Sequence, residues 1–83
     1  MSDSLNWHLK KAYSLAQKAK RLANANKDAK RIYEELNEII EDLELYYIKN
    51  MFYDEAEVGT RLKYYEKRLE LIEKRGSSIS LSD

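Results

Sequence analysis

Apolar residues recur every three or four positions in three separate segments of the 83-residue chain, and this spacing restricts its fold more than any other feature. In residues 58–74 the apolar positions are Val58, Leu62, Tyr65, Leu69 and Ile72. Their spacing places them on one stripe of an amphipathic α-helix. The chain contains two Gly and no Pro, which is typical of long helices and not of sheets joined by turns. We therefore expect an all-α domain.

The first segment has small side chains at most of its apolar positions. Its seam consists of Leu5, Leu9, Ala12, Ala16, Ala19 and Ala23. Small side chains allow a neighbouring backbone to approach closely, so this helix is expected either to pack tightly or to leave a shallow groove beside it. Polar cap residues before Leu5 and the Asn residues at 24 and 26 predict a helix over residues 5–24.

The second segment has a wider apolar stripe. It consists of Ala29, Ile32, Tyr33, Leu36, Ile39, Ile40, Leu43, Tyr47 and Ile48. Such a stripe can touch two neighbours, so we predict that a helix over residues 27–50 is the central one. A third helix is predicted over residues 54–75, because Asp54 and Glu57 resemble a capping box and Gly76 suits a helix C-terminus.

Three helices of this length with short connections predict an antiparallel three-helix bundle with up-down-up topology. Residues 1–76 would form this single domain, and residues 77–83 a flexible tail or linker. A long helical hairpin and a self-associating coiled coil remain alternatives, because both tolerate the same apolar spacing.

The formal net charge is zero, but charge is unevenly distributed along the chain. Residues 4–25 carry five cations and no acid, whereas residues 26–50 carry four cations and seven acids. The third helix has an acidic flank, formed by Glu66, Glu70 and Glu73. Its other flank contains Arg61, Tyr64, Arg68 and Arg75. If two helices pack beside it, each flank becomes one wall of a groove.

The residues needed for common catalytic or metal sites are missing from this sequence. It has no Cys, one His and no Gly-rich phosphate loop, so we expect no enzyme activity, no cofactor and no metal site. The tyrosine pairs at 46–47 and 64–65 are expected at the edge of the core, where a ring is buried and its hydroxyl stays wet. No apolar run approaches the ~20 residues that cross a bilayer, so we expect a cytoplasmic protein.

Three stretches in a fixed order carry a resemblance to a known family. LKKAYSLAQKA at residues 9–19, KDAKRIY at 27–33 and YYEKRLELIEK at 64–74 resemble the MIT domain (microtubule interacting and trafficking), particularly that of ESCRT-associated AAA ATPases, including archaeal ones. The resemblance implies a non-catalytic three-helix bundle that recruits an ATPase or adaptor by binding C-terminal peptide motifs of ESCRT-III-type proteins. These motifs bind either as a helix between the second and third helices or as an extended strand between the first and third.

The resemblance also implies two sets of candidate site residues. The groove between the second and third helices would be lined by Tyr47, Glu66, Glu70 and Glu73. The groove between the first and third helices would be lined by Leu15, Ala16, Ala19, Tyr64, Arg68 and Leu71. Glu66 stands where the family has a leucine that anchors a helical motif, so we favour the groove between the first and third helices. Direct nucleic-acid binding is not expected, and membrane contact would be indirect.

Two other functions are compatible with the same sequence. The apolar spacing also suits a small helical structural or co-chaperone subunit that acts through oligomerisation, so self-association is possible. The cations of the first helix could instead bind anionic lipid or nucleic acid, provided that they cluster away from the acidic second helix.

Overall fold

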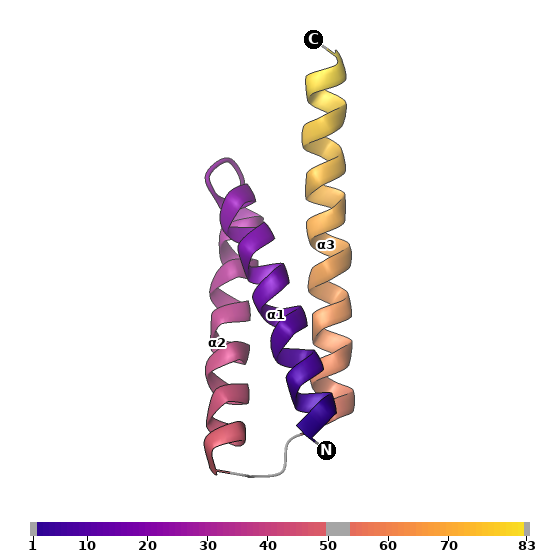
Figure 1. Ribbon diagram of the computed structural model, residues 1–83. Coiled ribbons are helices and arrows are strands. Elements are labelled where there is room, and N and C mark those ends of the chain that lie inside the picture. The colour runs from indigo at the N-terminus through magenta and orange to yellow at the C-terminus, as the bar shows by residue number, and fades with distance from the viewer. Residues whose placement is uncertain (1, 50–53, 83) are drawn as a thin grey trace.

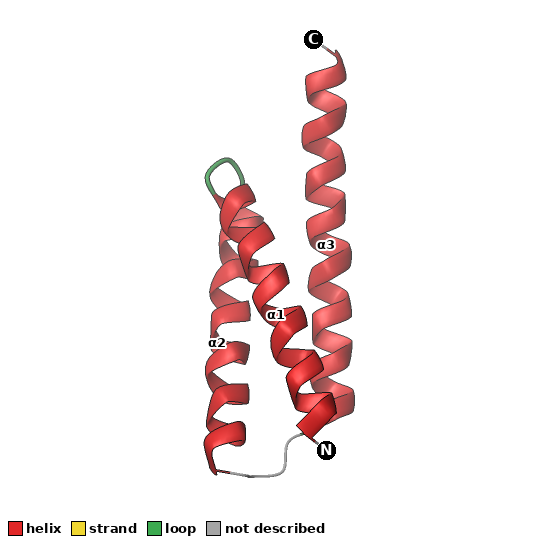
Figure 2. Cartoon of the chain, viewed as in Figure 1, coloured by secondary structure: helices red, strands yellow, loops and turns green. Residues whose placement is uncertain are grey.

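The computed structural model describes the backbone of residues 2–49 and 54–82, and the side chains of residues 5–49 and 54–75. The described chain forms α1 (Ser2–Ala23), α2 (Lys27–Lys49) and α3 (Glu55–Ser82). The three helices run up, down and up (Figure 1). In this view α1 lies in front, between α2 on the left and α3 on the right. Only helix and the short loop after α1 appear within these residues (Figure 2). The predicted antiparallel three-helix bundle is confirmed.

The starts of α2 and α3 are fixed by the polar residues that the sequence indicated. The Asn26 side-chain oxygen accepts a hydrogen bond of 3.0 Å from the backbone N–H of Ala29. The Asp54 carboxylate accepts one of 3.0 Å from the backbone N–H of Glu57. Each bond satisfies one of the N–H groups that a helix start leaves without an intrahelical partner. The two helices therefore begin where their caps predict.

The other helix boundaries differ from the prediction. α1 begins at Ser2, and α3 continues through Gly76 to Ser82, so the predicted helix end at Gly76 is wrong. Gly within a helix costs only ~1 kcal/mol relative to Ala, and no Pro follows to stop the helix. Residues 77–82, predicted as a flexible tail or linker, are helical in backbone, and this end of α3 projects beyond the turn between α1 and α2 (Figure 1). Position 50, where the second helix was predicted to end, lies outside the described residues.

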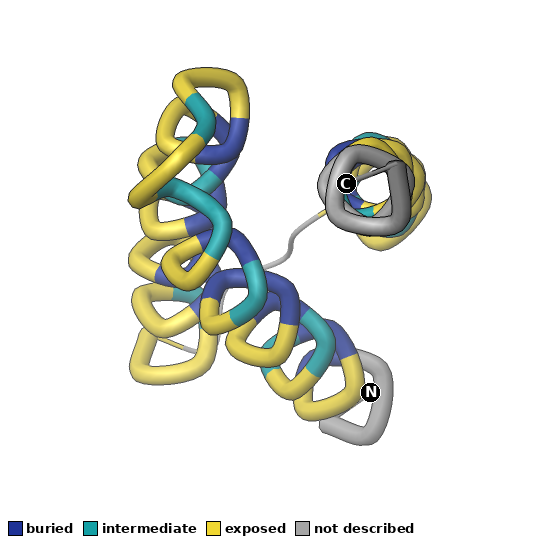
Figure 3. The backbone as a smooth tube through the Cα atoms, turned by 90° about the horizontal axis from the view of Figure 1, so that it is seen from above, coloured by how far each residue is buried: buried dark blue, intermediate teal, exposed yellow. Residues whose placement is uncertain are grey.

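The core is formed by the three predicted stripes. Its buried apolar residues are Leu5, Ala12, Leu15, Ala16, Ala19, Ala29, Ile32, Leu36, Ile39, Ile40, Leu43, Leu62, Tyr65, Leu69 and Ile72. Tyr47 and Ile48 were expected to continue the stripe of α2, but their exposed fractions are 58% and 75%. α1 diverges from α2 toward this end of the hairpin, so the last turn of α2 is left uncovered (Figures 1 and 3).

α1, not α2, is the central helix. Its backbone lies closest to that of α2 and less extensively close to that of α3, whereas the backbones of α2 and α3 approach each other closely at few positions. The expectation that the wide stripe of α2 would place it in the centre is therefore wrong. Ala12 and Ala19 are completely buried, and their small side chains allow the α2 backbone to approach α1 closely. The weak contact between α2 and α3 leaves their facing sides available to form a groove.

Candidate peptide-binding groove

The acidic flank of α3 faces α1. Glu66 forms a salt bridge with Lys11, and the Nζ atom of Lys18 lies 3.3 Å from Oε1 of Glu73. Gly59 is on the same flank, where the Nε2 atom of His8 lies 3.5 Å from the position that a Cβ would take. Glu66 and Glu73 were predicted to line a groove beside α2. Their pairing with α1 shows that this placement is wrong.

The basic flank of α3 faces α2. An NH₂ atom of Arg68 lies 3.8 Å from Oδ2 of Asp28, at the start of α2. The Tyr65 hydroxyl donates a hydrogen bond of 2.5 Å to Glu35 of α2 and accepts one of 3.0 Å from Arg61. These contacts join α2 to α3 through side chains. Arg68 was predicted to face α1, so its assignment is also reversed.

The predicted groove between α1 and α3 is not open. Leu15, Ala16 and Ala19 are buried in the core, with exposed fractions of 4%, 6% and 0%. Tyr64 and Leu71, which were to form the opposite wall, are 58% and 50% exposed. They share the flank of Arg68, because residues four and seven apart lie on one side of a helix. The six residues assigned to this groove are therefore not brought together.

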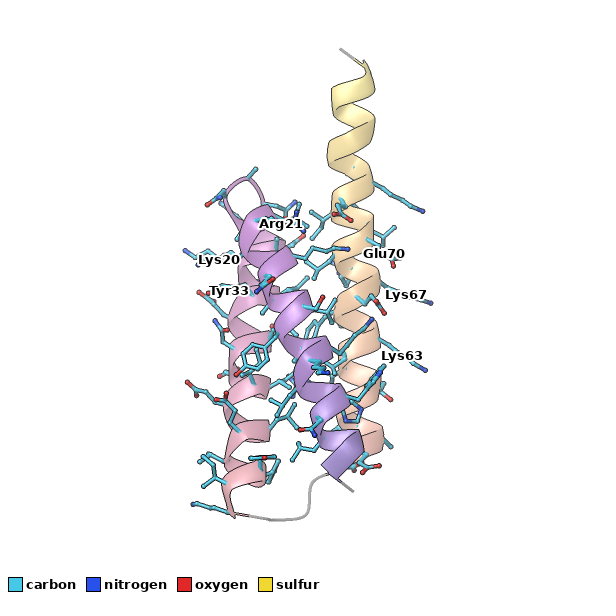
Figure 4. All side chains as sticks on the ribbon, in the orientation of Figure 1. Lys20, Arg21, Tyr33, Lys63, Lys67 and Glu70 are labelled. Atoms are coloured by element: carbon cyan, nitrogen blue, oxygen red, sulfur yellow. The ribbon has the colours of Figure 1, made fainter. Side chains whose placement is uncertain are left out.

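The predicted lining of the groove between α2 and α3 is dispersed as well. Tyr47 is exposed near the end of α2, while Glu66 and Glu73 pair with α1. Glu70 projects from the outer side of α3, together with Lys63 (Figure 4). No peptide could contact all four predicted residues from a single groove.

A groove does lie between α2 and α3, but other residues form it. Near the connection between these helices it contains a pocket of about 110 Å³. The pocket is lined by Ile39, Asp42, Leu43, Tyr46, Asp54, Glu57, Val58 and Arg61. Its lining thus combines apolar side chains from the edge of the core with charged side chains. This combination suits an apolar side chain of a partner that is flanked by polar groups.

Beyond the pocket, the edges of α2 and α3 that Asp28 and Arg68 connect differ in chemistry. On α2 the acidic residues Asp28, Glu35 and Asp42 recur every seven positions and so follow one edge of the helix. On α3 the wall consists of Tyr64, Arg68, Leu71 and Arg75, which follow one stripe of exposed or half-buried residues. We refer to the pocket and these two walls as the α2–α3 groove.

The hydrogen bonds of Tyr65 hold the two walls together. Burial, reinforced by the hydrogen bond to Glu35, raises the pKa of Tyr65 above its ordinary value. The hydrogen bond to Tyr65 in turn raises the pKa of Arg61. Tyr65 therefore remains a neutral hydroxyl near neutral pH, and it can accept a hydrogen bond from the Arg61 cation while donating one to the Glu35 carboxylate. This chain of bonds crosses the floor of the groove.

The sequence contains a signal that would have located this groove. α1 offers Lys11 and Lys18, which complement the acidic flank of α3, and α2 offers Asp28 and Glu35, which complement the basic flank. Matching the sign of each flank to its neighbour predicts the observed arrangement. The spacing of the apolar residues alone does not distinguish it from the opposite one.

Metal sites, membrane spans and similarity to known proteins bear on function alongside the groove. Within the described ranges, no three His, Cys, Asp or Glu residues gather in a way that could hold a metal ion. None of the helices in the described part of the chain combines the length and apolar character needed to cross a membrane. A scan against protein-family models and searches of curated proteins and of solved structures find no match to this chain. The fold and the pocket therefore define the class of protein: a three-helix bundle with a pocket between its second and third helices.

Proposed function

We propose that this chain is a non-catalytic interaction module that binds a short peptide segment of another protein in the α2–α3 groove. One observation carries the proposal: the backbones of α2 and α3 approach each other closely at few positions, and a pocket with an apolar and charged lining lies between the two helices. Tyr64 and Leu71 are exposed farther along α3, on the flank of Arg68. An amphipathic helix placed there would complete a four-helix arrangement, a common mode of peptide recognition.

The proposed partners are C-terminal motifs of ESCRT-III-type proteins, and the proposed role is recruitment of an ATPase or adaptor, as in the MIT domains that the sequence resembles. The resemblance alone supports this partner class. The pocket between α2 and α3 supports the mode of binding, because the surface between α1 and α3 is closed by buried residues. Glu66, which argued against a helical motif, lies outside this groove beside Lys11 and so presents no obstacle.

Titration with peptides from ESCRT-III C-termini, followed by amide chemical shifts, tests this function. We expect the shifts to centre on Ile39, Tyr46 and Val58, which line the pocket. No shifts at millimolar peptide would contradict the partner class. Shifts centred on the α1–α3 interface would contradict the groove.

A matched pair of variants separates groove contacts from general effects. Neither Leu71 nor Leu45 lines the pocket itself. Leu71→Ala removes an exposed side chain from the α3 wall, and Leu45→Ala removes one of nearly equal exposure (50% and 49%) that is not part of either wall. We expect Leu71→Ala to weaken peptide binding about tenfold, because an anchoring apolar contact is worth ~1–2 kcal/mol, while Leu45→Ala binds like the parent. Equal effects of both changes would refute the assignment of the wall.

A second candidate function is that of a small helical subunit acting through oligomerisation. The exposed Tyr47 and Ile48 at the end of α2 favour it, because apolar side chains uncovered side by side often belong to an interface. Sedimentation equilibrium distinguishes the two functions. A monomer at all concentrations contradicts this candidate, whereas an oligomer that Ile48→Asp dissociates supports it.

A further inference from the structure

Basic residues accumulate at the end of the bundle where α1 turns into α2. Residues 18–33 carry six cations and a single acid. The helices bring these positions together, because residues 24–26 form a tight connection between the last turn of α1 and the first turn of α2. Five of the cations are exposed, and we call them the basic turn surface: Lys20, Arg21, Lys27, Lys30 and Arg31.

The five cations of the basic turn surface are not paired in salt bridges within the described part of the chain. Lys18, the sixth cation, pairs with Glu73, and the single acid, Asp28, lies beside Arg68. None of the five remaining cations forms a salt bridge with a described side chain. Lys27 and Lys30 also lie in the first turn of α2, at the positive end of the helix dipole, where a cation is unfavourable. An external anion would reduce the repulsion among these cations and the repulsion between Lys27, Lys30 and the positive end of the α2 dipole.

We propose that the basic turn surface binds the anionic surface of a lipid membrane. Exposed lysines and arginines can approach a negatively charged layer of headgroups without a shaped pocket. The exposed side of the α1–α2 hairpin points away from α3 (Figure 3), and Lys20 projects on that side (Figure 4). The projecting end of α3 therefore does not cover Lys20. Direct contact of this kind differs from the indirect contact expected from the sequence.

The composition of the surface favours lipid over nucleic acid. Tyr33 is the one aromatic residue of segment 18–33, and its ring is partly buried against the core, so the segment offers no fully exposed ring on which a base of a single strand could stack. Its cations also flank a short turn and do not extend along a helix that could lie in the groove of a duplex. A diffuse layer of headgroups requires neither feature.

The distribution of acids orients the bundle on such a membrane. The opposite end carries Asp42, Asp54 and Glu57 around the pocket of the α2–α3 groove. An anionic surface repels this end while it attracts the turn, so the pocket would face away from the lipid. Membrane contact and peptide binding can then occur at the same time, and the membrane proposal does not depend on the identity of any peptide.

Vesicle binding of the full chain tests the proposal. The probe is phosphatidylcholine vesicles with and without phosphatidylserine, measured by co-sedimentation at low and physiological salt. We expect binding only with phosphatidylserine and weakening as salt rises. Each cation near an anionic surface contributes about fivefold in affinity, so Lys20→Gln, Arg21→Gln and Lys30→Gln together should weaken binding about 100-fold.

The control changes charge equally on another face. Lys63, Lys67 and Lys74 are exposed on α3, and the first two project away from α1 and α2 (Figure 4). Their triple Gln variant is expected to retain most of the binding, and circular dichroism of both variants verifies that the helices remain folded. Equal losses in the two variants would overturn the proposal, as would equal binding to vesicles without phosphatidylserine. Binding to duplex DNA with none to either vesicle would replace lipid by nucleic acid.

Discussion

The salt bridge between α1 and α3 provides a test of the handedness of the bundle, that is, of which flank of α3 lies beside α1. Lys11 and Glu66 form a salt bridge, and their side chains are 30% and 35% exposed. A pair with this much access to solvent contributes ~0.5 kcal/mol. Reversing one charge, as in Glu66→Lys, removes that attraction and introduces a repulsion of similar size, so the cost is about 1 kcal/mol. For a domain of this length we expect the melting temperature to fall by ~4–8 °C.

Reversing both charges restores the attraction. The double variant Lys11→Glu with Glu66→Lys should therefore recover most of the lost stability, and the coupling in the double-mutant cycle should equal about 2 kcal/mol at most. Thermal unfolding at low salt, followed by circular dichroism, measures the cycle. In 1 M salt the coupling should largely disappear, because the screening length falls to about 3 Å.

A second cycle tests the opposite arrangement of the helices. If the acidic flank of α3 faced α2, Glu66→Lys would gain attraction from acids of α2 and would couple to Glu35 instead of Lys11. In the observed fold Glu35 contacts Tyr65 on the other flank, so we expect no coupling between positions 35 and 66. Coupling of Glu66 to Glu35, with none to Lys11, would refute the described arrangement of both grooves.

Three further changes test the core, the α1–α3 contact and the bridge across the groove. Leu36→Ala should cost ~2–5 kcal/mol, because Leu36 is completely buried, and denaturant titration should show little folded protein at 37 °C; a variant as stable as the parent would contradict the described core. Gly59→Ala should raise stability by up to ~1 kcal/mol, since a Cβ there meets only His8 at an ordinary contact distance; a loss of stability would indicate a closer approach than the one described. In the parent the pKa of Tyr65 is raised by burial, so its contribution to the free energy of unfolding is complete below about pH 10 and is lost as the pH rises through the folded-state pKa. Tyr65→Phe should abolish this part of the alkaline loss, at a cost of ~1 kcal/mol near neutral pH, and an unchanged alkaline slope in a pH series of melting curves would speak against it.

The helices and most of the core follow from residue spacing and caps alone. Apolar residues three or four apart lie on one side of a helix in any helical fold, so Leu62 and Leu69 could be assigned to the core before any neighbour was known. Asn26 and Asp54 cap their helices through bonds to residues three positions ahead. These features depend on local geometry, which the sequence specifies directly.

The candidate groove could not be located in the same way. The apolar stripe of α3 determines which of its residues face the core. A left-handed and a right-handed bundle bury the same stripe, but they differ in which flank of α3 lies beside α1 and which lies beside α2. Glu66 was therefore assigned to the side of α2 although it contacts Lys11 of α1. The end of α3 was missed for a different reason: Gly76 is permitted at a helix end but does not require one. Tyr47 is exposed because α1 diverges from α2, a property of the packing angle.

The separation of the groove walls from the core affects how this chain can change over time. Leu36, Leu43, Leu62 and Leu69 are the largest fully buried side chains, and they hold the bundle together whichever residues occupy the walls. Tyr64 and Leu71 are half exposed, so substitutions there cost little folding free energy. In the proposed mode of binding, the exposed wall residues are therefore separate from the core, whereas Ile39 and Leu43 belong both to the core and to the pocket lining. Related chains can acquire new binding preferences through single substitutions at these wall positions while they keep the same fold.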